Sequence, residues 1–283
     1  GIFVSIGYST CYATTIPPVA KWFPPERKGL VTGAVVGALG LASVYFAPLV
    51  NWMVTGYGVG KTFQILGAGV ALTVILAAQF LNNPPAGYSA GALSGQPAAA
   101  RGRDYSWREM LRTRSFYQLW LIIFLSSTSG LMILGHMATI AKVQAGWENG
   151  FYHVILLAVF NSLGRIAGGV LSDRFGRITV MKAVFLLQAV NSAFFTFYVT
   201  PELLAVGAVV TGFSYGACIA LFPLLASDFY GMKNFGVNYG LVFTAWGVAG
   251  IAGPLLAGWV VDTTGAYSLA YMASGALMTA AIA

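Results

Sequence analysis

The stretch NSLGRIAGGVLSDRFGR at residues 161–177 decides the fold. Its first part ends an apolar run that contains a single charge, Arg165. Its second part brings Asp173, Arg174 and Arg177 together within five residues, and a new apolar run follows directly. Both runs are long enough to cross a bilayer, so the charged hairpin between them predicts a tight loop at a membrane surface.

The composition of the whole chain points to the same class. Hydrophobic residues make up 58% of the 283 residues and charged residues only 8%, with a mean hydropathy of +0.76. Soluble domains carry about 25% charged residues, and the ~10-residue alternating segments of a membrane β-barrel do not occur in the sequence. We therefore predict an all-α integral membrane protein. The chain opens and stops inside apolar runs, so we expect a piece of a longer protein.

The apolar segments predict nine membrane spans, most of them near the ~20 residues that a bilayer core requires. They cover residues 1–20, 29–54, 62–82, 115–140, 151–171, 179–200, 203–226, 236–260 and 266–283. The one long connection is 83–114. Its first part is rich in Pro, Gly, Ala and Ser and predicts a flexible linker. Its second part, DYSWREMLRTRS, predicts a short amphipathic helix at the membrane interface.

The basic residues alternate between the two sides of the predicted membrane. Twelve of the fifteen lysines and arginines fall in the connections 21–28, 83–114, 172–182 and 227–235. Only Lys61 and Lys142 lie on the opposite side, and Arg165 lies within a span. By the positive-inside rule the four basic connections are cytoplasmic, and we expect a bacterial inner membrane. The positive charge is thus a topology signal, and no nucleic-acid partner is predicted.

The chain also matches itself at a shift of 207 residues. The matched pairs include Tyr8 with Tyr215, Cys11 with Cys218, Gly33 with Gly240, Trp52 with Trp259 and Gly58 with Gly265. One ungapped register predicts two parallel repeats related by an axis along the membrane normal. The first copy would begin well upstream of Gly1, with room for three more spans. We therefore expect twelve spans in the full protein and the fourth to the twelfth here.

Six plus six spans with a charged central link, together with G-x-L-S-D-R-x-G-R at 169–177, resemble the major facilitator superfamily. Within it, residues 17–49, 161–177 and 234–254 resemble the oxalate/formate antiporter family. The resemblance implies two six-helix bundles with a pseudo-two-fold axis. The second half of an incomplete N-terminal bundle would occupy 1–82, the cytoplasmic linker 83–114 and the C-terminal bundle 115–283.

The same resemblance implies a secondary transporter that moves small organic anions by alternating access. We expect the partners to be a carboxylate anion and the bilayer, with an exchanged anion or a proton for coupling, and we expect a monomer. The sequence contains no nucleotide loop, metal-ligand cluster or nucleophile–base pair, so neither an enzyme nor a cofactor or metal is predicted. A sensor that keeps the transporter fold and binds a carboxylate without moving it is the alternative of another class.

Arg165 is the first candidate for binding the anion. A guanidinium forks onto the two oxygens of a carboxylate, and a low-dielectric cavity strengthens the pairing. The resemblance supports this role, because oxalate-transporting members hold their dianion at the arginine of N-x-x-G-R. Asn161, four residues earlier on the same helical face, could orient the guanidinium. The structural alternative is that Arg165 snorkels to the membrane surface.

Trp246 bears on the charge of the substrate. The resemblance places a lysine at this position of T-A-x-G-V-A-G in oxalate-transporting members, whereas the span here has no charge from 236 to 261. One cation in place of two favours a monocarboxylate such as formate, lactate or pyruvate. An oxalate or other dicarboxylate:formate antiporter remains the alternative, and Trp246 could also serve packing alone.

Four further residues are candidates for lining the substrate site. His136 could carry a proton or bind the substrate, because its pKa is within reach of physiological pH; the alternative is a histidine hydrogen-bonded inside the bundle. Tyr8 and Tyr12 share a helical face, and Tyr215 is the repeat mate of Tyr8. The resemblance implies that their two spans line the cavity, while ordinary packing is the alternative.

The loop motif itself predicts a conformational gate. Its residues are Gly169, Asp173, Arg174, Gly176 and Arg177. A carboxylate at the start of a loop can cap a neighbouring helix N-terminus and pair with an arginine. We expect these contacts to form when the cytoplasmic side is closed and to break when it opens. The alternative is a topology signal with a surface ion pair that contributes less than ~1 kcal/mol.

Overall fold

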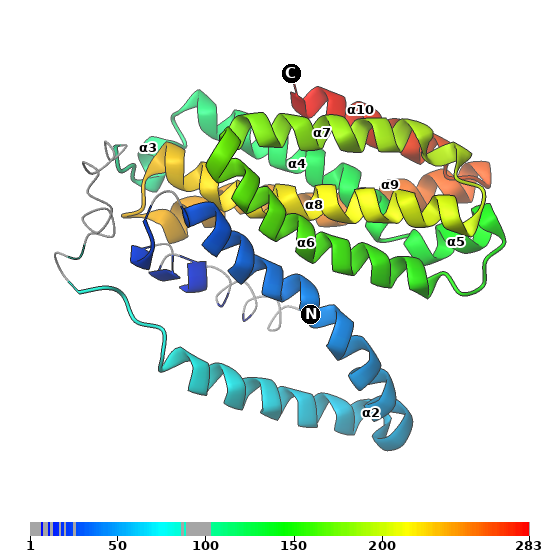
Figure 1. Cartoon of the computed structure of the whole chain (residues 1–283), viewed down its shortest axis with the longest axis horizontal. Helices are drawn as coiled ribbons and strands as arrows, with labels where there is room; N and C mark the ends of the chain where they lie inside the picture. The colour runs from blue at the N-terminus through cyan, green and yellow to red at the C-terminus, as the bar shows by residue number, and fades with distance from the viewer. Residues whose placement is uncertain are drawn as a thin grey trace.

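The computed structural model describes residues 7, 11, 14–16, 18–19, 21–24, 27–85, 88 and 103–282. The regular elements within these ranges are helices, and most of them run side by side in one elongated bundle (Figure 1). They are α2 (Lys28–Ala78), α3 (Trp107–Met110), α4 (Arg114–Leu134), α5 (Met137–Ala145), α6 (Phe151–Phe175), α7 (Arg177–Phe194), the 3₁₀ turn η3 (Phe195–Phe197), α8 (Pro201–Tyr230), α9 (Phe235–Thr264) and α10 (Ser268–Ile282).

Within the described ranges, six helices are long and apolar enough to cross a membrane. One is the part of α2 from Trp52 to Ala78, and the others are α4, α6, α7 with η3, α8 and α9. The first turns of α2 and all of α10 form shorter apolar helices. A bilayer core offers no water to backbone amides and carbonyls, so a chain of this hydropathy must satisfy them within helices.

Two glycines mark corresponding bends in the chain. Gly58 has φ +76 and divides α2 into two arms, which correspond to the predicted spans 29–54 and 62–82 and diverge in Figure 1. Gly265 has φ +72 and ends α9. These residues are mates in the 207-residue repeat, and glycine adopts positive φ without the steric penalty of a Cβ.

The predicted span 115–140 is interrupted. Helix α4 ends at Leu134, His136 leaves the helical conformation with φ −116 and ψ 5, and α5 begins one residue later. Gly135 weakens the helix at this place. The His136 ring is held by groups on neighbouring elements, described below, which fixes the interruption. Hydropathy cannot register such a break, because both sides of it are apolar.

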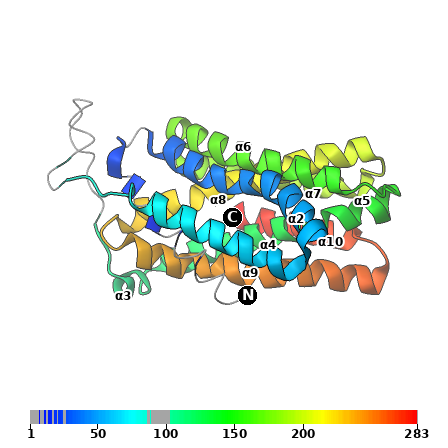
Figure 2. The same cartoon turned by 90° about the horizontal axis from the view of Figure 1, so that it is seen from below.

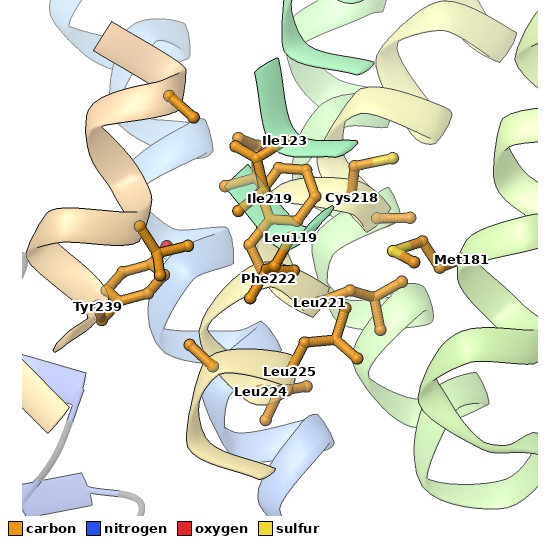
Figure 3. Packing of buried hydrophobic residues seen from close by; sticks show 14 of the residues in the cluster. Leu119, Ile123, Met181, Cys218, Ile219, Leu221, Phe222, Leu224, Leu225 and Tyr239 are labelled. Atoms are coloured by element: carbon orange, nitrogen blue, oxygen red, sulfur yellow. The ribbon is translucent and has the colours of Figure 1, made fainter. Parts of the chain in front are cut away.

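Helix α6 lies between α2 and α8, the two neighbours with which it packs most extensively. Seen from below, the first arm of α2 runs along α6 (Figure 2). Helix α4 packs on α9, and α10 covers α4 and α7. Figure 3 shows the core where α4 meets α8, with Leu119 and Ile123 beside Ile219 and Phe222. All four of these side chains are at most 5% exposed.

Small residues let the backbones around α6 touch. A Cβ added to Gly33 of α2 would lie 2.5 Å from the carbonyl oxygen of Arg165. On the other side of α6, a Cβ added to Gly216 of α8 would collide with the carbonyl oxygen of Asn161. Close backbone approach of this kind is how helices associate in lipid. It brings the polar side chains of α6 within reach of both neighbours.

The α6–α7 turn, the α8–α9 turn and α3 lie at one end of the bundle, which we call the linker end (Figure 1). The first turn of α2 reaches the same end. The His136 interruption lies toward the opposite end, where α5 also lies. The linker end therefore gathers segments that are far apart in the sequence.

Candidate functional site

Arg165 extends from the middle of α6 toward α2. Its Nη1 donates a hydrogen bond of 2.5 Å to the carbonyl oxygen of Val36, a residue that is fully buried. Its Nε is buried as well, while the side chain as a whole is half-buried. The guanidinium therefore lies at the contact between two helices. An ionised group held there faces protein rather than hydrocarbon, which is where intramembrane charges are tolerated.

Asn161 lies one turn from Arg165 on α6 and is 6% exposed. Its Oδ1 is buried and has no hydrogen-bond partner among the described residues. A Cβ added to Gly40 of α2 would lie 3.5 Å from this oxygen. Asn161 thus presents a buried hydrogen-bond acceptor at the α2–α6 contact. A hydrogen-bond donor that entered this contact could bond to it.

Tyr215 and Trp246, from α8 and α9, form a second group. Trp246 Nε1 donates to Tyr215 Oη at 2.6 Å, and the Tyr215 ring packs directly on Gly130 of α4. The Trp246 ring stacks on Phe243 with centroids 5.2 Å apart and planes 6° apart. Tyr215 directly precedes Gly216, whose backbone lies against Asn161. Helix α8 therefore connects the pair Tyr215 and Trp246 to the part of α6 that carries Asn161 and Arg165.

The remaining predicted site residues are placed differently. His136 Nε2 lies 3.1 Å from the carbonyl oxygen of Pro254, and its Nδ1 lies 3.0 Å from Tyr267 Oη. A carbonyl only accepts, so Nε2 donates to Pro254, and in the neutral ring Nδ1 accepts from the tyrosine. Both ring nitrogens of His136 therefore have partners within the bundle. Tyr8 and Tyr12 lie outside the described residues.

The α6–α7 turn is bound to the first turn of α2 through Asp173. The two carboxylate oxygens of Asp173 accept from the backbone N–H groups of Gly29 and Leu30, each at 3.0 Å. These are amides of the first turn of α2, which have no partner within their own helix. The carboxylate also lies at the positive end of the helix dipole. Arg177 Nη1 donates to the same carboxylate at 2.8 Å.

Arg177 has a second acidic partner, which sequence reasoning did not identify. Its Nε donates to Asp228 Oδ2 at 3.2 Å, near the end of α8, and its Nη1 also donates to Ser172 Oγ. In the sequence, Asp228 could be singled out only because it is the acidic residue of the basic connection 227–235. Gly176, with φ +86, permits the sharp turn that aims Arg177. Arg174 instead lies over the ring of Phe175.

A cavity of about 390 Å³ opens at the linker end between α4, α7, α8 and α10. Its walls are mostly apolar, with Ser115, Gln118 and Lys182 among the polar residues that line it. None of the predicted site residues lines this cavity. In the described part of the chain, no group of three or more His, Cys, Asp or Glu side chains is placed to hold a metal ion.

Comparisons with known proteins agree with this architecture. The chain is 29% identical over 261 residues to the oxalate:formate antiporter of Oxalobacter formigenes, covering 87% of this chain and 58% of that protein. It is 25% identical over 305 residues to monocarboxylate transporter 12-B of Danio rerio, covering 97% and 63%. The chain thus spans about three fifths of the length of these relatives.

The fold is shared with a solved transporter, the Escherichia coli fucose:proton symporter FucP, at a TM-score of 0.69 and 15% identity, over 95% of this chain and 71% of that one. The sequence profile of the Major Facilitator Superfamily matches residues 1–190 and 153–283. The predicted all-α membrane fold and the predicted family are therefore confirmed. The chain belongs to the Major Facilitator Superfamily, a family of integral, multi-pass membrane transporters.

Proposed function

We propose that this chain is part of a secondary transporter of small organic anions, and that its substrate is a monocarboxylate such as formate, lactate or pyruvate. The observation that carries the proposal is the Arg165 guanidinium, which is held at the α2–α6 contact inside the membrane. The printed substrates of two relatives, oxalate and formate for one and monocarboxylates for the other, are of the same chemical class.

Arg165 offers a direct link between binding and helix movement. Its Nη1 donates to the Val36 carbonyl, which is a neutral acceptor. A carboxylate is a stronger acceptor and can take two parallel N–H bonds from one guanidinium. An arriving anion therefore competes with α2 for the same donors. Binding of the anion weakens the α2–α6 contact, and we propose that this competition is how substrate binding favours separation of the two helices.

The number of cations favours a monoanion. Among the described helices after residue 113, Arg165 is the one arginine or lysine in the middle of a membrane-spanning helix. Trp246, where the resemblance would place a lysine, donates its N–H to Tyr215 instead. A second carboxylate would lose its water without gaining a cation, which costs several kcal/mol. Each ~1.4 kcal/mol is tenfold, so a dianion should bind at least about tenfold more weakly.

We further propose that the contacts of Asp173 and Arg177 form the gate at the linker end. They tie the α6–α7 turn to the start of α2 and to the end of α8 when this end is closed. By the positive-inside rule, the basic connections 21–28, 83–114, 172–182 and 227–235 favour this as the cytoplasmic end. We propose a bacterial inner membrane as its location. In the proposed division into 1–82, 83–114 and 115–283, α2 and α6 belong to different bundles. Rocking of the bundles then opens and closes their contact.

Exchange of oxalate for formate is a second candidate, favoured by the 29% identity to an antiporter of these two anions. Transport by the full-length protein in proteoliposomes distinguishes the candidates. We expect uptake of labelled formate or lactate, and weaker competition by oxalate. Arg165→Gln should abolish uptake. Trp246→Lys should raise relative affinity for oxalate, whereas Trp246→Phe, which replaces the indole by a smaller ring without an N–H and adds no charge, should not.

Three results would contradict the proposal in different ways. A native protein that prefers oxalate over formate and lactate would refute the single-cation argument and favour the antiporter alternative. Saturable carboxylate binding without uptake or exchange, in protein that is correctly inserted, would favour a sensor over a transporter. If the Arg165→Gln variant took up the anion as fast as the native protein, Arg165 would not be the anion-binding residue and the proposal would fail.

A further inference from the structure

The end of the central linker is bound to the turn between α8 and α9. The backbone N–H of Tyr105 donates to the carbonyl oxygen of Tyr230, the last residue of α8, at 3.1 Å. The carboxylate of Asp104 accepts from the backbone N–H of Lys233 in the turn, also at 3.1 Å. One residue of the linker therefore holds the last residue of α8, and the residue before it holds the turn that follows.

The start of α9 is bound by the same linker residue. The carbonyl oxygen of Tyr105 accepts from the side-chain amides of Asn234 and Asn238, each at 2.9 Å. The two asparagines are four residues apart, which places them on one face of the helix. Asn238 is 1% exposed. The Tyr105 ring meets the Tyr230 ring edge-on, with centroids 5.7 Å apart. Both helices of the turn thus contact one linker residue.

The shape of the turn is complementary to Asp104. Gly231 has φ +77, a conformation that favours glycine. A Cβ at this position would collide with an Asp104 carboxylate oxygen and would lie 3.0 Å from the Asp104 Cα. The turn therefore needs glycine both for its backbone conformation and for the close approach of the linker.

The linker segment also carries its own local structure. Ser106 and Glu109 form a capping box around the start of α3, and Arg103 pairs with Glu109 at 2.9 Å. The hydrogen bonds from Ser106, with that from Arg103, hold the pKa of Glu109 below its usual range. Met110 is fully buried in the core cluster that also contains Tyr230. Residues 103–110 are thus a fixed part of the bundle end.

This contact lies directly beside the proposed gate. Asp228, which pairs with Arg177, is two residues before Tyr230 in the last turn of α8. The Asp228 side chain is 44% exposed, and exposed ion pairs contribute little unless the backbone holds the two charges in place. Tyr105 binds the backbone of this same turn of α8, at the carbonyl oxygen of Tyr230.

We propose that Asp104 and Tyr105 are positioning residues for the gate: by binding the α8–α9 turn they keep Asp228 in reach of Arg177 and so favour the closed linker end. The proposal rests on the proposed function of Asp173, Arg177 and Asp228. It assigns to the linker a role in the conformational equilibrium beyond joining the bundles. The substrate group at Arg165 is not touched by these residues, so turnover should change while substrate affinity does not.

Hydrogen–deuterium exchange on the full-length protein tests the proposal. The amides of Gly29 and Leu30 donate to Asp173 when the gate is closed, so their exchange reports gate opening. We expect Asp104→Ala to speed their exchange by about threefold or more and to change turnover with KM unchanged. Asp104→Asn keeps an acceptor oxygen, so the exchange of Gly29 and Leu30 and the turnover should both return to the native values.

Three further variants make the test decisive. The double variant Asn234→Ala with Asn238→Ala removes both side-chain donors to Tyr105 and should act as Asp104→Ala does. Arg112→Gln, an exposed neighbour, should leave exchange and turnover unchanged. Faster exchange confined to 228–238, with Gly29 and Leu30 unaffected, would overturn the positioning role. Asp173→Asn shows whether the gate exists: if it too changes nothing, the gate proposal fails, and the positioning proposal fails with it.

Discussion

A methyl group at Gly33 should force α2 and α6 apart. The Cβ of a Gly33→Ala variant would lie 2.5 Å from the carbonyl oxygen of Arg165 and 3.3 Å from the Cα of Ile166. Ordinary van der Waals contacts between such atoms begin at about 3.5 Å. The obstructing atoms are backbone, so no side-chain rotation relieves the clash. The helices must separate by about 1 Å, or the closed arrangement must be given up.

The expected shift follows from the bonds at this contact. Separation weakens the bond from Arg165 to Val36 and the two bonds from α2 to Asp173. Bonds to charged groups contribute about 1.5–3 kcal/mol each, and the gain in helix propensity from alanine cancels because residue 33 is helical in both arrangements. Loss of a single bond then shifts the closed-to-open balance by about 1.5–3 kcal/mol. That is roughly 10- to 150-fold toward open.

Spin labels on the full-length protein measure this shift. Labels at Arg27→Cys and Lys182→Cys, both exposed at the linker end, should report a longer distance in Gly33→Ala. Gly275→Ala is the matched control, because its Cβ would meet its nearest neighbours at 3.5 and 3.6 Å and fits without strain. Unchanged distances in Gly33→Ala, or an equal change in Gly275→Ala, would refute the reasoning.

Three further outcomes are expected. Asp173→Asn loses the charge that faces the start of α2 and should slow turnover without affecting insertion; unchanged turnover at equal expression would count against the gate. The link 83–114 should be cleaved by protease in inside-out vesicles and protected in intact cells, and the reverse result would invert the proposed topology. Gln144→Leu should lower stability by about 1–3 kcal/mol, seen as a lower melting temperature than for the exposed control Gln118→Leu. Gln144 donates to two carbonyls around η3 and accepts from Tyr271 at 2.8 Å, and the variant leaves these groups unpaired.

The fold was largely predictable, because the bilayer limits what an apolar chain can do. Segments such as 151–171 and 203–226 must be helices, since only helices satisfy their own backbone in hydrocarbon. The charged turn at 172–177 had to lie at a surface for the same reason. The shift of 207 residues also predicted equivalent positions, and its mates Gly58 and Gly265 both adopt positive φ.

Contacts between distant segments could not be predicted in this way. Asp228 is 51 residues from Arg177, and Tyr105 is 125 residues from Tyr230; no periodicity relates them. The His136 interruption could not be predicted from hydropathy, because the helices on both sides of it are apolar. A local signal could have located the start of the predicted short amphipathic helix, because Ser106 and Glu109 have the spacing of a capping box.

The position of Arg165 predicts which anions would drive the proposed transport cycle. A ligand shifts a conformational equilibrium only by its difference in affinity for the two states. In the structure the guanidinium already donates to Val36, so the proposed mechanism predicts that an anion binds more tightly once α2 has withdrawn. An anion that forms two parallel N–H bonds gains the most from that withdrawal. A halide, which accepts without a fork, gains less. Carboxylates should therefore open the α2–α6 contact, measured by the same pair of spin labels, at concentrations where chloride does not, and equal opening by chloride would mean that charge alone, rather than the fork, is recognised.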